Sequence, residues 1–205
     1  IPWDPNRAEL MSSDQAAQRG YTRLAEWLAQ TEGLWDEFGK GKTTFKQKID
    51  YSKYLTRQFP LPELRVVYSK SGTLPAATLV RDSDILIDHK LYWAQPSSEE
   101  EAYFLVSILN SETARARSAQ WQSEGQWGKR DFDKAIFNLV IPAFNPGSKL
   151  HASLSKLGRE AEVVASGVRY EEDEYFTTIR RRVRDSLFSC GVAEKLENRV
   201  EDLLK

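Results

Sequence analysis

The sequence contains few of the residues that build metal sites, disulfides and membrane spans. It has one cysteine and two histidines among 205 residues. No run approaches the ~20 apolar positions of a membrane-spanning helix, so we expect no membrane partner. A lone cysteine, Cys190, excludes an intramolecular disulfide and a multi-cysteine zinc site. With only His89 and His151 available, we expect no metal, no cofactor and no catalytic residue in this stretch of chain.

Nucleotide-binding loops are also missing. The stretch from Gly39 to Thr43 is Gly-Lys-Gly-Lys-Thr, but it lacks the spacing of a P-loop and no apolar strand precedes it. The spaced glycines of a dinucleotide-binding turn are absent as well. The sequence therefore predicts no nucleotide site.

The chain does contain enough apolar and aromatic material for a folded core. Hydrophobic residues make up 40% of the sequence, and six Trp, eight Tyr and nine Phe are too many for a chain that stays disordered. The first residue is Ile1 rather than methionine, and no basic-then-apolar leader follows it. We expect an excised piece of a longer, cytoplasmic protein.

Positive charge is concentrated in one segment. Residues 1–39 hold three basic and seven acidic residues, a net charge of −4, whereas residues 40–81 hold nine basic and two acidic residues, a net charge of +7. The net charge of −1 for the whole chain hides this segment. A local positive field attracts phosphate and other anions, so residues 40–81 are the first candidates for a nucleic-acid contact.

Hydrophobic periodicity predicts an α+β fold. Helical spacing predicts helices over 17–28, 34–38, 98–109, 113–121, 150–164, 176–187 and 192–203, and β-branched or aromatic runs predict strands over 64–68, 76–80, 85–87, 91–93 and 137–141. Residues 123–131 have two glycines and no period, which predicts an exposed loop. The expected architecture is a small central, mostly antiparallel sheet flanked by N-terminal and C-terminal helices.

Three segments follow from this pattern. An N-terminal helical segment with the basic stretch covers residues 1–59, a sheet-containing core covers 60–146, and C-terminal helices cover 147–205. The first boundary falls at Phe59-Pro60-Leu61-Pro62, because proline forbids a continued helix.

Two polar features of the C-terminal segment are interpreted as supporting the fold rather than forming a functional site. His151 lies near the start of the predicted helix 150–164, beside the expected cap Ser148. The basic run Arg180 to Arg184 follows the acidic run Glu171 to Glu174, which is the order that a helix dipole favours.

Lysine and arginine alternate with aromatic residues in the segment 40–81, and a second basic and aromatic run lies in the predicted loop 123–131. Positive side chains attract phosphate whatever the base sequence, and aromatic faces stack on unpaired bases. The alternatives are a solvated basic face over an aromatic core and a flexible crossover. The residues selected for phosphate or base contact are Lys40, Lys42, Arg65, Lys70, Lys129 and Arg130, and those selected for stacking or wedging are Tyr68 and Trp127.

Several short motifs follow one another in a familiar order. They are Arg65–Tyr68 with Ser71-Gly72, Leu91–Trp93, Glu100–Phe104 leading to Ile108–Ser111, and Lys129–Lys134 leading to Leu139–Pro142. In this order, residues 50–165 resemble the C-terminal region of adenine-specific DNA methyltransferases of restriction-modification systems. The Leu-Asn-Ser helix end and the late Ile-Pro strand are similar to those of such domains and of type I specificity subunits.

The resemblance implies a target recognition domain without the catalytic part. The family's Asn/Asp-Pro-Pro-aromatic motif and its glycine-containing cofactor motif are missing, and only Asn145-Pro146-Gly147 is present. The implied parent protein binds S-adenosylmethionine and methylates adenine in its catalytic methyltransferase domain. The implied partners of this fragment are that domain and double-stranded DNA, whose phosphates and base edges it would contact.

Two other functions stay open at this point. A helical module that docks a catalytic subunit would use the apolar stripe Leu196, Val200 and Leu203. A magnesium-dependent nuclease would use carboxylates such as Asp82 and those of the run 84–90. The spacing of these acids is shorter than nucleases of the restriction type use, and a turn beside an edge strand also explains them.

Overall fold

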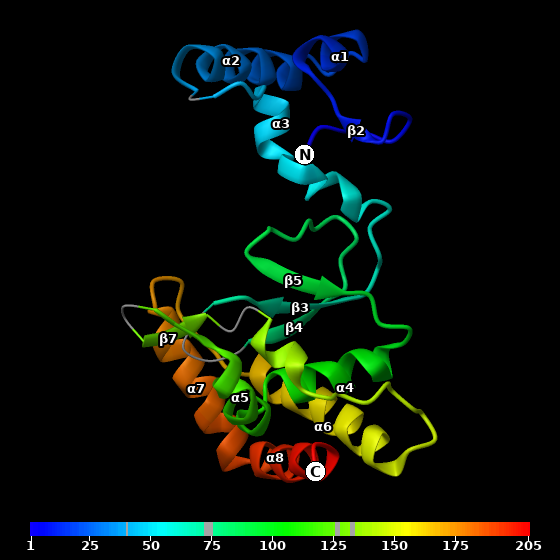
Figure 1. Cartoon of the computed structure of the whole chain (residues 1–205), viewed down its shortest axis with the longest axis vertical. Coiled ribbons are helices and arrows are strands. Elements are labelled where there is room, and N and C mark those ends of the chain that lie inside the picture. The colour runs from blue at the N-terminus through cyan, green and yellow to red at the C-terminus, as the bar shows by residue number, and fades with distance from the viewer. Residues whose placement is uncertain (40, 72–75, 126–127, 132–133) are drawn as a thin grey trace. The chain divides into compact units, whose positions relative to one another are not determined.

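The computed structural model describes residues 1–39, 41–71, 76–125, 128–131 and 134–205, and for 123–125 and 128–131 it describes the backbone alone. The chain divides into two compact units, unit 1 from Ile1 to Pro62 and unit 2 from Glu63 to Lys205 (Figure 1). Helices and small antiparallel sheets make up the described part, which confirms the predicted α+β class. The helices expected as a separate segment over 147–205 belong to the same unit as the central sheet.

Unit 1 is mainly helical. Its elements are β1 (Trp3–Asp4), β2 (Glu9–Leu10), α1 (Ser13–Gln18), α2 (Thr22–Phe38), α3 (Phe45–Ile49) and the 3₁₀ turns η1 (Tyr51–Lys53) and η2 (Thr56–Gln58). The helix predicted over 17–28 is split in two, because Gly20 ends α1 with a φ of 77°. In contrast, α2 continues through Gly33, where the sequence predicted a break.

A small core and a buried carboxylate help to hold unit 1 together. Ala16, Ala25 and Leu28 are buried where α1 packs on α2, and Phe45 of α3 packs against them. The buried carboxylate of Asp4 accepts a hydrogen bond from Arg19 Nη2 at 2.6 Å. Burial raises the pKa of Asp4, but the hydrogen bonds that this carboxylate accepts outweigh burial and leave the pKa below its usual value.

The central sheet lies in unit 2. Its strands β3 (Arg65–Ser69), β4 (Ala77–Val80) and β5 (Leu91–Ala94) are arranged in the order β4-β3-β5, with both pairs antiparallel. Three of the predicted strands are therefore confirmed. The fourth, over 85–87, is not a strand, because the carboxylates that flank it organise turns. Asp82 Oδ1 accepts from the Asp84 N–H at 2.7 Å, and Asp88 Oδ1 accepts from the Lys90 N–H at 2.9 Å.

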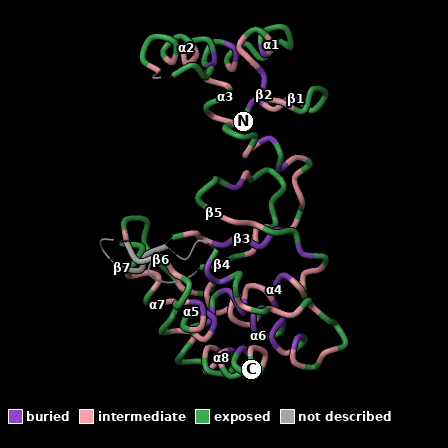
Figure 2. The backbone as a smooth tube through the Cα atoms, viewed as in Figure 1, coloured by how far each residue is buried: buried purple, intermediate pink, exposed green. Residues whose placement is uncertain are grey.

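Helices cover one face of this sheet. They are α4 (Glu99–Leu109), α5 (Glu112–Ser118) with the 3₁₀ turn η3 (Ala119–Trp121), α6 (Lys149–Ser166), α7 (Phe176–Ser189) and α8 (Val192–Leu203). Figure 1 shows α4 beneath the sheet, with α6 and α8 on the far side of α4. Figure 2 shows that buried residues concentrate along these contacts. The buried core includes Val66 and Tyr68 of β3, Phe104 and Ile108 of α4, Leu154 of α6, and Leu196 and Val200 of α8.

The contact between α4 and α6 is unusually close. A Cβ atom placed on Gly158 of α6 would lie 2.5 Å from Ser107 Oγ and 2.7 Å from the Tyr103 carbonyl oxygen, both on α4. The Ser107 hydroxyl in turn donates to the Leu154 carbonyl oxygen at 3.0 Å. Only glycine permits this approach of the two backbones.

The segment between α5 and α6 differs from the sequence prediction. The predicted loop 123–131 contains an antiparallel pair, β6 (Ser123–Gly125) with β7 (Gly128–Asp131). The predicted strand 137–141 begins instead with the 3₁₀ turn η4 (Ala135–Asn138). Residues 137 and 138 belong to this turn, and residues 139–141 form neither helix nor strand. The run ends at Pro142, which has no N–H for a sheet.

His151 belongs to the core of unit 2. Its ring stacks on Phe104 with 4.7 Å between ring centroids, and its Nδ1 accepts a hydrogen bond from the Asn145 N–H at 3.0 Å. Ser148 caps α6, as predicted. His151 therefore supports packing, in agreement with the structural interpretation.

Among the residues described, no helix combines the length and the apolar composition needed to cross a membrane.

Candidate nucleic-acid interface

Four of the residues selected from the sequence have no described side chain. Lys40 and Trp127 lie outside the described residues. Lys129 and Arg130 lie on β7, for which the structure gives the backbone only. Their contact with DNA stays a prediction.

Arg65 and Tyr68 correct the sequence prediction. Arg65 is 0% exposed and Tyr68 is 2% exposed, so neither side chain lies on a surface that a duplex contacts. The reason is that β3 is the central strand, and all four residues from Arg65 to Tyr68 are buried. Alternation along a strand predicts one solvent-facing side only when one face of the sheet is open.

The buried guanidinium of Arg65 is incompletely paired. Its Nη2 donates to the Asp82 carbonyl oxygen at 2.5 Å, whereas Nε and Nη1 have no hydrogen-bond partner among the described residues. Burial lowers the pKa of Arg65, and the negative charge of Asp82 opposes this shift. The side chain is thus a structural cation whose burial is costly.

Lys70, at the end of β3, is engaged in local contacts. Its Nζ lies 4.3 Å from the centroid of the Tyr92 ring and donates to the His89 carbonyl oxygen at 2.5 Å. The side chain is half-buried. A phosphate contact by Lys70 would compete with these two interactions.

Lys42 is exposed, and further cations follow it in unit 1. Lys48 on α3, Lys53 on η1 and Arg57 on η2 are all exposed. We call Lys42, Lys48, Lys53 and Arg57 the basic surface. Within the described part of the chain, none of the four forms an ion pair with a carboxylate, whereas the neighbouring Lys46 pairs with Glu9 at 3.0 Å.

A turn organised by Asp50 shapes this basic surface. Asp50 Oδ1 accepts from the N–H groups of Leu55 (2.9 Å) and Thr56 (3.1 Å), and Asp50 Oδ2 accepts from Thr56 Oγ1 (2.6 Å). Between them, Ser52 and Lys53 adopt left-handed backbone conformations with φ of 55° and 56°. Such conformations are costly for residues other than glycine and persist where the surroundings enforce them. We call residues 50–56 the Asp50 turn.

Two tyrosines of the Asp50 turn have different surroundings. The Arg57 guanidinium lies over the Tyr54 ring, 4.5 Å from its centroid, and Tyr54 is half-buried. Tyr51 is 71% exposed. The turn therefore presents one covered and one open aromatic ring among the cations of the basic surface.

Sequence reasoning missed most of this arrangement. Lys48, Lys53 and Arg57 were counted in the positive segment but were not selected as contacts, and Tyr51 was one of several aromatics. The signal that points to the turn is Asp50 followed at 56 by threonine, because a short acidic side chain caps nearby backbone N–H groups. The left-handed pair Ser52 and Lys53 leaves no comparable trace in the residue types.

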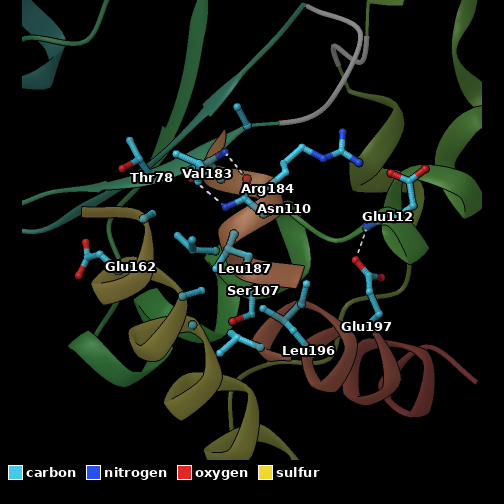
Figure 3. Close-up of a pocket in the computed structure, with 18 of the residues that line it drawn as sticks. Thr78, Ser107, Asn110, Glu112, Glu162, Val183, Arg184, Leu187, Leu196 and Glu197 are labelled. Atoms are coloured by element: carbon cyan, nitrogen blue, oxygen red, sulfur yellow. Dashed lines mark hydrogen bonds between the residues drawn. The ribbon is translucent and has the colours of Figure 1, made fainter. Parts of the chain in front are cut away.

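Unit 2 contains a cavity of about 730 Å³ that the sequence did not predict. Figure 3 shows α7 on one side of it, with Val183 and Leu187 turned toward Leu196 of α8 and toward α4. Arg180 and Arg184 also line it, and burial together with the positive charge of Arg184 lowers the pKa of Arg180. The structure thus places part of the basic run 180–184 at a cavity wall, whereas Arg182 forms an ion pair with Glu174.

Polar networks border the cavity. Glu197 of α8 caps the start of α5, accepting from the N–H groups of Glu112 (2.7 Å) and Thr113 (3.0 Å), as Figure 3 shows for Glu112. Glu162 of α6 is held by Arg81 Nη1 at 2.9 Å and by the Tyr103 hydroxyl at 2.6 Å. These hydrogen bonds, chiefly that from Arg81, lower the pKa of Glu162.

In the structure, residues assigned to the two alternative functions have structural roles. Leu196 and Val200 are buried in the core of unit 2, so the stripe proposed for docking is already covered by the unit itself. Asp82 and Asp88 organise turns. Within the described ranges, no group of three or more acidic, histidine or cysteine side chains is arranged to hold a metal ion.

In comparisons with known proteins, no family model, no curated protein and no solved structure matches the chain.

Proposed function

We propose that the chain is a DNA-binding target recognition domain from the C-terminal region of a larger, cytoplasmic adenine-specific DNA methyltransferase or restriction-modification enzyme. The basic surface carries the proposal. It exposes four cations between residues 42 and 57, and none of them is neutralised by a carboxylate in the part of the chain that the structure describes. The order of motifs over residues 50–165 supports the choice of enzyme class.

Unneutralised cations favour a polyanionic partner. Each lysine or arginine that meets a DNA phosphate releases condensed counterions, which drives binding of any duplex sequence. A lysine that already forms an ion pair contributes less to the free energy of DNA binding, because binding would first break that pair. In the proposed parent protein, this surface binds the DNA phosphate backbone. The catalytic domain binds S-adenosylmethionine and acts on adenine extruded from the duplex.

A salt titration of duplex binding tests the proposal on the whole chain. If the four cations of the basic surface and Lys129 and Arg130 each neutralise one phosphate, log K should fall against log salt with a slope of about −5. The affinity of this chain for DNA should be low at physiological salt, since the catalytic domain of the proposed parent protein would supply the remaining DNA contacts. A slope near zero, or no binding at low salt, would refute the proposal.

Charge reversal locates the contact. Lys48→Glu combined with Lys53→Glu should weaken duplex binding at low salt at least tenfold and reduce the salt slope by about two, one for each lost phosphate contact. The matched control is Lys149→Glu combined with Lys195→Glu, which reverses the charge of two exposed lysines on α6 and α8. Equal weakening by the control would show that only net charge matters and would contradict a defined basic surface.

A further inference from the structure

We infer that the Asp50 turn is a stacking platform for an unpaired DNA base, with Tyr51 as the residue that contacts the base. The inference rests on the proposed function and adds the feature of DNA that this surface prefers. Positive charge alone would bind any duplex, whereas a stacking ring selects DNA in which a base has left its partner.

The ring of Tyr51 is open to a ligand. It is 71% exposed, and it makes no ring or cation contact with another described residue. Tyr54 in the same turn shows the contrast, because the Arg57 guanidinium covers its face at 4.5 Å. Stacking of a flat partner on an exposed aromatic face is favourable, because it removes the ring from water.

The backbone directly after Tyr51 is held in a costly conformation. Ser52 and Lys53, which follow it directly, are both left-handed, with φ of 55° and 56°. Three hydrogen bonds to the Asp50 carboxylate, one of them only 2.6 Å long, enforce this backbone path. Strained backbone of this kind clusters at ligand contacts, where it preorganises the contacting residue.

The charges beside the ring identify the partner as nucleic acid. Lys48 lies on α3 just before the turn, and Lys53 lies within it, so both flank Tyr51 along the chain. A base that stacks on Tyr51 is linked to phosphates on each side, which these cations would meet. In an intact duplex both faces of a base are covered by neighbouring bases, so the Tyr51 ring can stack only on an unpaired or extruded base.

The experiment compares two duplexes that differ in one base. One carries 2-aminopurine as an unpaired bulge, and the other carries it fully paired. The whole chain should bind the bulged duplex about tenfold more tightly, and the emission of the bulged 2-aminopurine should fall on binding because stacking quenches it. Tyr51→Phe should keep both effects, since it retains the ring.

Tyr51→Ala should abolish the preference and the quenching while leaving the salt slope of paired-duplex binding unchanged. Asp50→Ala should reduce both effects as well, because it frees the backbone that positions Tyr51. Equal affinity of the wild-type chain for the two duplexes, or a preference that survives Tyr51→Ala, would overturn this inference. Either result would leave the proposed function unaffected. Absence of salt-dependent binding to either duplex would instead overturn the proposed function.

Discussion

Asn110 completes the outer edge of β4 by pairing with the backbone of Ala77. Asn110 Nδ2 donates to the Ala77 carbonyl oxygen at 2.9 Å, and the Ala77 N–H donates to Asn110 Oδ1 at 2.9 Å. Because β4 is an edge strand, these two backbone groups have no strand beside them. Asn110 ends α4 and the next residue, Ser111, caps α5. The Leu-Asn-Ser sequence thus links a helix end, a strand edge and a helix start.

Replacing Asn110 should therefore weaken unit 2. We expect Asn110→Ala to lower the free energy of unfolding by about 1–2 kcal/mol, since two hydrogen bonds to backbone are lost. Urea unfolding measures the effect. Asn198→Ala on α8, also exposed, is the control and should change stability by less than about 0.5 kcal/mol. Equal effects of the two changes would mean that the pairing with Ala77 contributes nothing.

Two glycine-to-alanine changes should act in opposite directions. Gly158→Ala should destabilise unit 2 by about 1–3 kcal/mol, because the new methyl group would lie 2.7 Å from the backbone oxygen of Tyr103. Gly33→Ala in α2 should stabilise unit 1 by about 0.5–1 kcal/mol, since no atom lies within 4 Å of the added Cβ. Thermal unfolding resolves both effects. Stabilisation by Gly158→Ala would contradict the close contact of α4 with α6.

Arg65 offers a test of its structural role. Arg65→Met keeps an unbranched apolar stem and removes a buried charge with two unpaired nitrogens. The free energy of unfolding should stay the same or rise, by up to ~2 kcal/mol. Duplex affinity should not change, because the side chain is buried. A loss of DNA binding in a folded Arg65→Met variant would restore Arg65 as a DNA contact.

The Arg81–Glu162 pair predicts how stability depends on pH. The pKa of Glu162 is lowered from its reference of 4.5 in the folded chain, chiefly by the hydrogen bond from Arg81. The charged carboxylate therefore stabilises the folded state above pH 4.5, and this contribution is lost as pH falls through the lower, folded pKa.

Glu162→Gln isolates that contribution. The variant should be less stable than the wild type at pH 7, and the difference should shrink as pH is lowered below 4.5. Urea unfolding at pH 7 and at pH 3 measures it. The control is Glu160→Gln, whose carboxylate is 3.9 Å from Lys156 on the same helix. A difference between Glu162→Gln and wild type that does not vary with pH would contradict the role of the charge.

Local patterns were enough to predict most helices and the central strands. The Ser98 cap fixed the start of α4, and β-branched or aromatic runs located β3, β4 and β5. The errors arose where tertiary contacts decide. The predicted strand 137–141 begins inside the 3₁₀ turn η4 instead, and the pairing of β6 with β7 has no apolar alternation to reveal it.

The candidate site was predictable in charge but not in detail. Residues 40–81 hold an excess of lysine and arginine, and the basic surface lies within this segment, where Lys42 is exposed. Arg65 and Tyr68 were misassigned because the sequence does not show that both faces of β3 are covered. The open ring of Tyr51 depends on backbone conformation at Ser52 and Lys53, which residue types do not specify.

Helix α7 has no buried residue, although its apolar side chains Val183 and Leu187 line the cavity of unit 2. A helix with few buried contacts opens at a lower free energy than one in the core. The backbone amides of α7 should therefore exchange with deuterated solvent before those of α4, even though both helices belong to unit 2. Any molecule that fills the space beneath α7 would register as slower exchange along this helix.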